Sequence, residues 1–99
     1  MLDLNQILLY LISNKIRFKK EYHLQKIGVF GSLARGEQNQ GSDIDLIVEF
    51  EENTEDLYSI KQKLKEEIQN RFNVPVDICR EKYIKSIFRE QILSEAQYA

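Results

Sequence analysis

The chain has 99 residues, and its 14 Lys or Arg and 16 Asp or Glu give a formal net charge of −2. A chain of this length builds one modest core, so we expect a single domain over residues 1–99. With 42% hydrophobic and 30% charged residues, the composition excludes collagen-like and disordered chains. The balanced charge lacks the basic footprint of nucleic-acid-binding modules, so direct nucleic-acid binding is not expected.

Cysteine usage and the N-terminal hydropathy bear on where the protein works. Cys79 is the only cysteine, which excludes an internal disulfide and a thiolate zinc site and favours a reducing compartment. The apolar run from Ile7 to Ile12 has no Lys or Arg before it and no small-residue cleavage site after it. It is predicted to be neither a signal peptide nor a membrane span, and we expect a cytoplasmic protein.

The first part of the chain predicts a helix, a strand and a helical turn. The helix is expected over residues 3–19, where apolar residues recur at the spacing of one helix face: Leu4, Ile7, Leu8, Leu11 and Ile12. Residues 27–30 are apolar on both faces and stop at Gly31, as in a central strand that enters a tight turn. Residues 33–37 suit about one helical turn. A loop is then expected at Asn39, Gln40 and Gly41.

The rest of the chain predicts two strands and two helices. Residues 43–50 alternate between an apolar face and a face that carries carboxylates, as in a strand with one packed side. Helical periodicity follows over residues 57–72, a third strand over 74–79 and a last helix over 84–92. The order αβαβαβα predicts an α/β (α+β) fold in which helices pack on a small sheet.

A Gly-Ser pair at the end of the first strand points to phosphate binding. Gly36 is followed by Glu37 rather than Lys, which excludes a P-loop, and no dinucleotide fingerprint is present. What remains is a strand that runs into Gly31 and Ser32 at the start of a helical turn. Backbone N–H groups and a hydroxyl at such a place can hold phosphate oxygens, and glycine lets the backbone approach an anion closely.

Three aspartates on neighbouring strands predict a metal site beside that turn. Asp43 and Asp45 are two residues apart and project from one face of their strand, and Asp77 on the third strand can join them. Three convergent carboxylates can hold two Mg²⁺ ions about 3.5–4 Å apart, which grip the attacking and leaving oxygens of a phosphoryl transfer. A nucleoside triphosphate would supply the remaining oxygen ligands. The alternative interpretation is that Asp43 and Asp45 are solvated residues on an open sheet face.

These motifs together resemble those of the DNA polymerase beta-like nucleotidyltransferase superfamily, whose signature is Gly-Ser, then Asp-x-Asp on a strand, then a later acidic residue. The strings GSLARG and SDIDL are most similar to the minimal nucleotidyltransferases (MNT proteins) encoded beside HEPN-domain partners in prokaryotic toxin–antitoxin pairs. The resemblance covers nearly the whole chain. It implies a small mixed sheet with helices packed on it.

The resemblance also implies a role for each matched residue. Ser32, with the Gly31 turn, would bind the β- and γ-phosphates of ATP. Asp43 and Asp45 would ligate two Mg²⁺ ions, and Asp77 would ligate the catalytic ion and help to deprotonate the incoming hydroxyl.

Arg35 occupies the arginine position of the family, and two roles for it stay open: it contacts phosphate, or it braces the loop.

The implied function is transfer of AMP from ATP to a tyrosine hydroxyl of a HEPN toxin, with release of pyrophosphate, which makes the protein an antitoxin. Its small size leaves the acceptor surface to a partner. Two alternatives stay open: an antitoxin that only binds and occludes its partner, and a nucleotidyltransferase for a small molecule or a nucleic-acid end. The sequence selects neither the nucleotide base nor the acceptor, nor a homodimer over a hetero-complex.

Overall fold

A computed structural model describes residues 2–37 and 41–99 of the chain. The predicted loop residues Asn39 and Gln40 lie outside the described residues, and Gly41 lies in a turn. The elements, in chain order, are α1 (Leu4–Ser13), α2 (Lys15–Tyr22), β1 (Leu24–Phe30), α3 (Gly31–Arg35), β2 (Ile44–Phe50), α4 (Leu57–Phe72), β3 (Val76–Arg80), the 3₁₀ turn η1 (Glu81–Tyr83), α5 (Ser86–Glu95) and β4 (Gln97–Tyr98).

The strands form one mixed sheet in the order β3-β2-β1-β4. β1 is antiparallel to both of its neighbours, whereas β2 and β3 are parallel. Parallel strands need a crossover connection, and α4 provides it between β2 and β3. The parallel register places Asp45 beside Asp77, so two of the predicted site residues share one end of the sheet.

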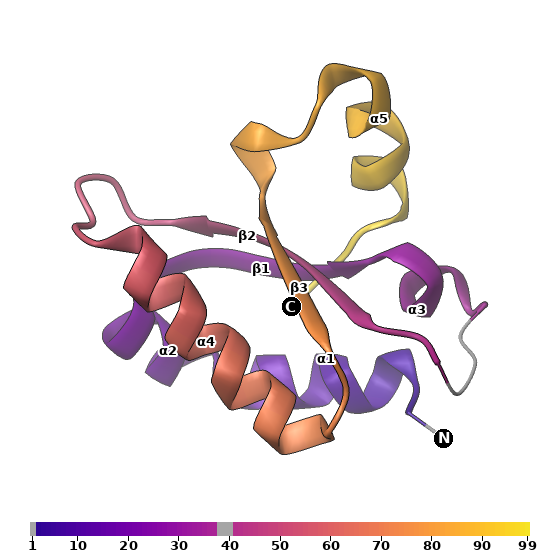
Figure 1. Ribbon diagram of the computed structural model, residues 1–99, viewed down its shortest axis with the longest axis horizontal. Coiled ribbons are helices and arrows are strands. Elements are labelled where there is room, and N and C mark those ends of the chain that lie inside the picture. Colours follow the sequence, from indigo (N-terminus) through magenta and orange to yellow (C-terminus); the bar gives the residue numbers. More distant parts are fainter. Residues whose placement is uncertain (1, 38–40) are drawn as a thin grey trace.

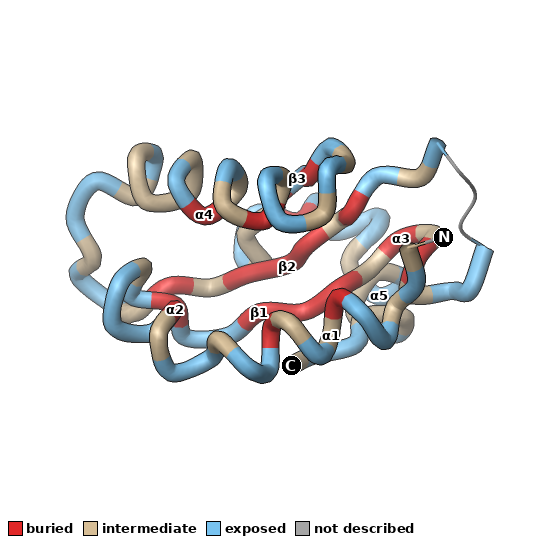
Figure 2. Tube along the Cα trace, turned by 90° about the horizontal axis from the view of Figure 1, so that it is seen from below, coloured by how far each residue is buried: buried red, intermediate tan, exposed pale blue. Residues whose placement is uncertain are grey.

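Helices α1, α2 and α4 pack against one face of the sheet, and α5 stands on the other side (Figure 1). Figure 2 shows buried stretches of β1 and β2 running between α4 and the pair α1 and α2. The core lies between these helices and the sheet. Its fully buried members include Ile7, Leu11, Phe18, Val29, Ile44, Leu46, Val48, Leu64 and Ile68.

The predicted helix over residues 3–19 is wrong in one respect, because the structure divides it into α1 and α2. The break lies at Asn14, whose side-chain amide donates to the Tyr10 carbonyl oxygen at 2.8 Å. Such side-chain bonds to the backbone compete with the regular helical pattern. The predicted apolar stripe also differs from the buried face: Ile12, before the break, is 56% exposed although it fits the stripe, while Phe18, after the break, is fully buried.

The other differences concern the ends of elements. α4 has the predicted bounds, but β1 starts at Leu24, and the last helix spans residues 86–95 rather than 84–92. Strand β4 was not predicted. It pairs Tyr98 with Gly28 of β1, where an added Cβ would lie 2.9 Å from Tyr98 Cδ1. The absence of a side chain at Gly28 therefore leaves room for Tyr98 when β4 pairs with β1.

Among the helices of residues 2–37 and 41–99, none has the length and hydropathy needed to cross a membrane.

Candidate functional site

The Gly-Ser turn lies where β1 ends and α3 begins. Gly31 is buried and has φ +77°, a conformation that favours glycine. An added Cβ would overlap the Asp45 carboxylate and lie 3.1 Å from its Cγ. Ser32 Oγ lies 3.4 Å from Ser42 Oγ, so the two halves of the sequence motif are adjacent. Glycine at position 31 is thus required by contact with Asp45, a reason that the sequence alone does not reveal.

The three predicted aspartates gather beside this turn. Asp45 is partly buried on β2 and is the register partner of Asp77 on β3, while Asp43 lies just before β2. Burial, and then the charges of Asp77 and Asp43, raise the pKa of Asp45, and the positive charge of Arg35 opposes that shift. Within the described residues, Asp45 accepts no side-chain hydrogen bond and forms no ion pair. Among the described residues, the negative charge of this cluster is therefore opposed only by the nearby charge of Arg35 and is not paired.

A divalent cation fits this donor set. Carboxylate oxygens are preferred ligands of Mg²⁺, and the crowded negative charge that raises the pKa of Asp45 is what a cation would relieve. In residues 2–37 and 41–99, no group of three or more His, Cys, Asp or Glu is placed so that it could hold a metal ion, so the three aspartates do not form a ready three-carboxylate site. Mg²⁺ commonly keeps one or two carboxylates and takes its other oxygens from water and phosphate.

Arg35 points toward two carboxylates of its own chain. Its Nε donates to Glu37 Oε2 at 2.6 Å, and its Nη1 lies 3.1 and 3.2 Å from the two carboxylate oxygens of Glu95. The Gly31 N–H also points to Glu95 Oε1, at 3.4 Å. Sequence reasoning missed Glu95. Glu95 lies beyond the predicted helix over residues 84–92, and its contact joins residues 60 apart in the chain, so no local signal marks it.

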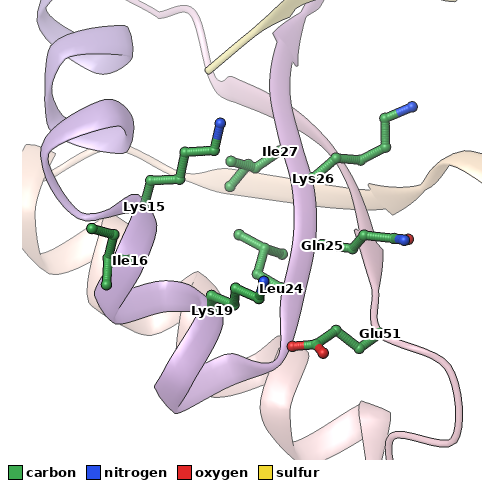
Figure 3. A pocket seen from close by; sticks show the side chains of 8 residues that line it. All are labelled: Lys15, Ile16, Lys19, Leu24, Gln25, Lys26, Ile27 and Glu51. Atoms are coloured by element: carbon green, nitrogen blue, oxygen red, sulfur yellow. The ribbon is translucent and has the colours of Figure 1, made fainter.

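The cavity between α2 and the start of β1 lies away from these residues (Figure 3). It has a volume of about 330 Å³, and none of the predicted site residues lines it. It opens at the Leu24 end of β1, whereas Gly31 follows the other end. The chemistry-bearing side chains are therefore not in this cavity but at the opposite end of the same strand. The cavity is lined by Lys15, Ile16, Lys19, Leu24, Gln25, Lys26, Ile27 and Glu51.

Comparisons with known proteins identify the family of the chain. Residues 10–99 match the nucleotidyltransferase domain family. The protein adenylyltransferase MntA of Thermococcus cleftensis is 34% identical over 98 residues, which cover 99% of this chain and 97% of that protein.

Two solved structures share the mixed α/β fold, which confirms the predicted fold class. One, assigned as a minimal nucleotidyltransferase, has a TM-score of 0.77 and 32% identity, and the match covers 97% of this chain and 95% of that one. The other comes from a complex of a tri-AMPylated Shewanella oneidensis HEPN toxin with an MNT antitoxin, with a TM-score of 0.57, 17% identity, and 87% and 66% coverage. The chain belongs to the nucleotidyltransferase domain family and has the fold of its minimal members.

Proposed function

We propose that this protein is a Mg²⁺-dependent nucleotidyltransferase that transfers AMP from ATP to a tyrosine hydroxyl of a HEPN toxin and thereby acts as its antitoxin. One observation carries the proposal: Asp45 lies with Asp77 and Asp43 against the Gly31 turn, and among residues 2–37 and 41–99 no cationic side chain forms an ion pair with it. A relative that is 34% identical over 99% of this chain is named a protein adenylyltransferase, which supports the same activity.

The proposed reaction is an in-line displacement at the α-phosphorus of ATP. The tyrosine oxygen bonds to that phosphorus, the bond to the oxygen that bridges to the β-phosphorus breaks, and pyrophosphate leaves. The hydroxyl proton passes to Asp77, which is exposed and reachable from outside. Ser32 and the Gly31 turn orient the phosphates. Asp43, Asp45 and Asp77 would hold the Mg²⁺, which supplies positive charge for the developing negative charge on the phosphate oxygens.

The acceptor approaches from outside because the carboxylates lie at the surface. Both Asp43 and Asp77 are exposed. A hydroxyl on a folded partner can therefore reach the cluster. The solved relative in complex with a tri-AMPylated HEPN toxin supports such a toxin as the acceptor.

The direct test is an AMP-transfer assay with a purified HEPN-domain protein as the acceptor. With Mg²⁺ and ATP labelled at the α-phosphate, the partner should gain label on tyrosine, located by mass spectrometry. D43N/D45N should abolish the transfer. The matched control is E51Q/E52Q, which neutralises two adjacent carboxylates outside the proposed site and should transfer normally. Absence of transfer from every nucleoside triphosphate, with both proteins folded, would refute the proposal.

Binding without catalysis is the second candidate function. It is favoured by large apolar side chains that are exposed on the helices, such as Leu9 at 67%, Ile16 at 74% and Ile87 at 81%. Exposed apolar surface of this kind suits contact with another protein. D43N/D45N separates the two functions, because it should still bind and neutralise the toxin if occlusion is sufficient. Loss of neutralisation with unchanged binding would favour catalysis.

A further inference from the structure

The last residue of α5 reaches the Gly-Ser turn through a partly buried carboxylate. Glu95 is only 14% exposed, and it pairs with Arg35 Nη1 at 3.1 Å. The same carboxylate faces the Gly31 N–H at 3.4 Å. A negative charge at the C-terminal end of a helix opposes the helix dipole. The position of Glu95 is therefore explained by its contacts with the turn rather than by its own helix.

The turn is enclosed from two sides. Glu95 faces the N–H of Gly31, while Asp45 lies so close to the Gly31 Cα that an added Cβ would overlap its carboxylate. α5 has no buried residue and stands on the side of the sheet away from α1 and α4 (Figure 1). It is held by the Glu95 contacts, by the bond from Arg89 Nη1 to the Glu81 carbonyl oxygen at 2.7 Å, and by the pairing of β4 with β1. Loss of Glu95 would thus free one side of the turn next to Asp45.

Arg35 is occupied by carboxylates of its own chain. Glu37 binds its Nε at 2.6 Å and Glu95 binds its Nη1, so two negative charges already face this guanidinium. These bonds engage Nε and Nη1 and hold the guanidinium toward its own chain. The contacts favour the bracing role of the two that the sequence leaves open.

We propose that Glu95 is a positioning residue: it holds Arg35 and the Gly31 N–H, fixes the turn against Asp45, and so increases nucleotide affinity without touching the nucleotide. The effect on nucleotide affinity rests on the proposed function, because it assumes that the Gly31 turn binds nucleotide. The positioning itself concerns the free protein and can be measured without ligand.

The first experiment measures amide hydrogen exchange in the free protein. E95A should reduce the protection of the amides at Gly31 and in α3, while the amides of β2 keep theirs. E95Q keeps the shape but loses the charge, so it should give a smaller change and serves as the test if E95A does not fold. E90A is the matched control, since Glu90 is an exposed carboxylate on the same helix. Unchanged protection at Gly31 in a folded E95 variant would overturn the proposal.

The second experiment measures the affinity for a non-hydrolysable ATP analogue with Mg²⁺ by calorimetry. E95A should weaken binding by roughly 10- to 100-fold, the usual range for partners that orient ligating groups. R35A should weaken binding of the analogue by about the same factor. R35A/E95A should weaken it no more than either single change, because the same Arg35–Glu95 contact is lost in all three variants. E90A should bind like the wild type.

Three outcomes would contradict the proposal. A further loss in R35A/E95A relative to E95A would show that Arg35 binds phosphate directly. Tighter binding by E95Q would show that Glu95 competes with the nucleotide. Equal affinity of E95A and wild type for the ATP analogue would show that Glu95 has no role in nucleotide binding. If the wild type binds no nucleotide at all, the proposed function fails, and the exchange measurement still decides whether Glu95 positions the turn.

Discussion

Two partly buried carboxylates of this protein, Glu67 on α4 and Asp45 on β2, lie in opposite electrostatic surroundings. Glu67 accepts hydrogen bonds from Tyr10 Oη at 2.6 Å and Tyr22 Oη at 2.7 Å, and it pairs with Arg17 at 2.6 Å. Burial raises the pKa of Glu67, but these bonds outweigh it and lower the pKa to about 2. Through these three contacts Glu67 connects α1 and α2 to α4.

Within the part of the chain that the structure describes, Asp45 has no such hydrogen-bond or ion-pair partner. Burial and two neighbouring aspartates raise its pKa, and only the charge of Arg35 acts in the other direction. A carboxylate whose bonds are all made within the chain stabilises the fold, whereas one left among like charges destabilises it and is available to a cation. The difference distinguishes a structural carboxylate from a functional one, and each can be tested by removing it.

The largest effect is expected for D45N, measured as AMP transfer and as thermal unfolding. The substitution should reduce transfer by roughly 100- to 1000-fold, the usual loss when one group that stabilises transition-state charge is removed. It should also raise Tm, because the buried charge and its repulsion from Asp77 and Asp43 disappear. E52Q, at an exposed carboxylate, should change neither quantity. A D45N protein with lower Tm and full activity would reverse the assignment of the two carboxylates.

E67A should have the opposite effect. It leaves Arg17 and two tyrosine hydroxyls without their shared acceptor, which should cost about 2 kcal/mol, less than for a fully buried pair because both partners are partly exposed. For a domain of this size that is a decrease in Tm of about 8–16 °C. E66A removes an exposed carboxylate next to it on α4 and is the control. Equal Tm values for E67A and E66A would show that the contacts of Glu67 contribute little.

The sequence predicts those parts of the molecule that depend on local pattern. Apolar periodicity predicted α4 with its observed bounds, and the alternation of β2 placed Asp45 on the face away from the core. The Asp-x-Asp and Gly-Ser motifs are short-range as well. The parallel direction of β2 and β3 is made possible by α4 acting as a crossover, and the observed register then aligns Asp77 with Asp45.

What the sequence does not predict depends on contacts between distant residues. Glu67 bonds to Tyr10, 57 residues away, and Glu95 to Arg35, 60 residues away. Both glutamates look like ordinary surface charges on amphipathic helices. The break at Asn14 depends on one side-chain bond that periodicity cannot register. Each of these features is decided by tertiary geometry rather than by local propensity.

Gly31 and Gly36 allow the crowding around Asp45 to be measured, because only Gly31 lies against its carboxylate. Gly31 and Gly36 have similar φ values, +77° and +73°, but a Cβ at Gly36 would meet nothing within 4 Å. G36A should therefore cost only the strain of the left-handed conformation, about 1 kcal/mol, measured by urea unfolding. G31A should cost about 1 kcal/mol more, because its methyl group also displaces the Asp45 carboxylate.

A double-mutant cycle isolates the crowding by Asp45. In a D45A background the cost of the Gly31 substitution should fall toward that of G36A, since the overlapping carboxylate is gone and only the Cβ of residue 45, 3.3 Å away, remains close. If G31A costs the same with and without Asp45, the contact between the turn and the carboxylate has no energetic consequence.

The smallest effects, and the clearest in sign, are expected from pH. Because folding lowers the pKa of Glu67 from 4.5 to about 2, the unfolded chain binds its proton first, and the stability that Glu67 provides is lost as pH falls through that window. Folding raises the pKa of Asp45 above its ordinary 3.8, so its destabilising effect fades as acid protonates it in the folded state.

Urea unfolding of wild type, E67Q and D45N from about pH 6 down to about pH 2 separates these contributions. At neutral pH, E67Q should be less stable than the wild type and D45N more stable. Both differences should shrink in acid, because a protonated carboxyl resembles the amide that replaces it. If the stability loss of E67Q is the same at all pH values, the shape of the Glu67 side chain rather than its charge holds the helices together. If the stability gain of D45N is the same at all pH values, repulsion between ionised carboxylates does not destabilise this end of the sheet.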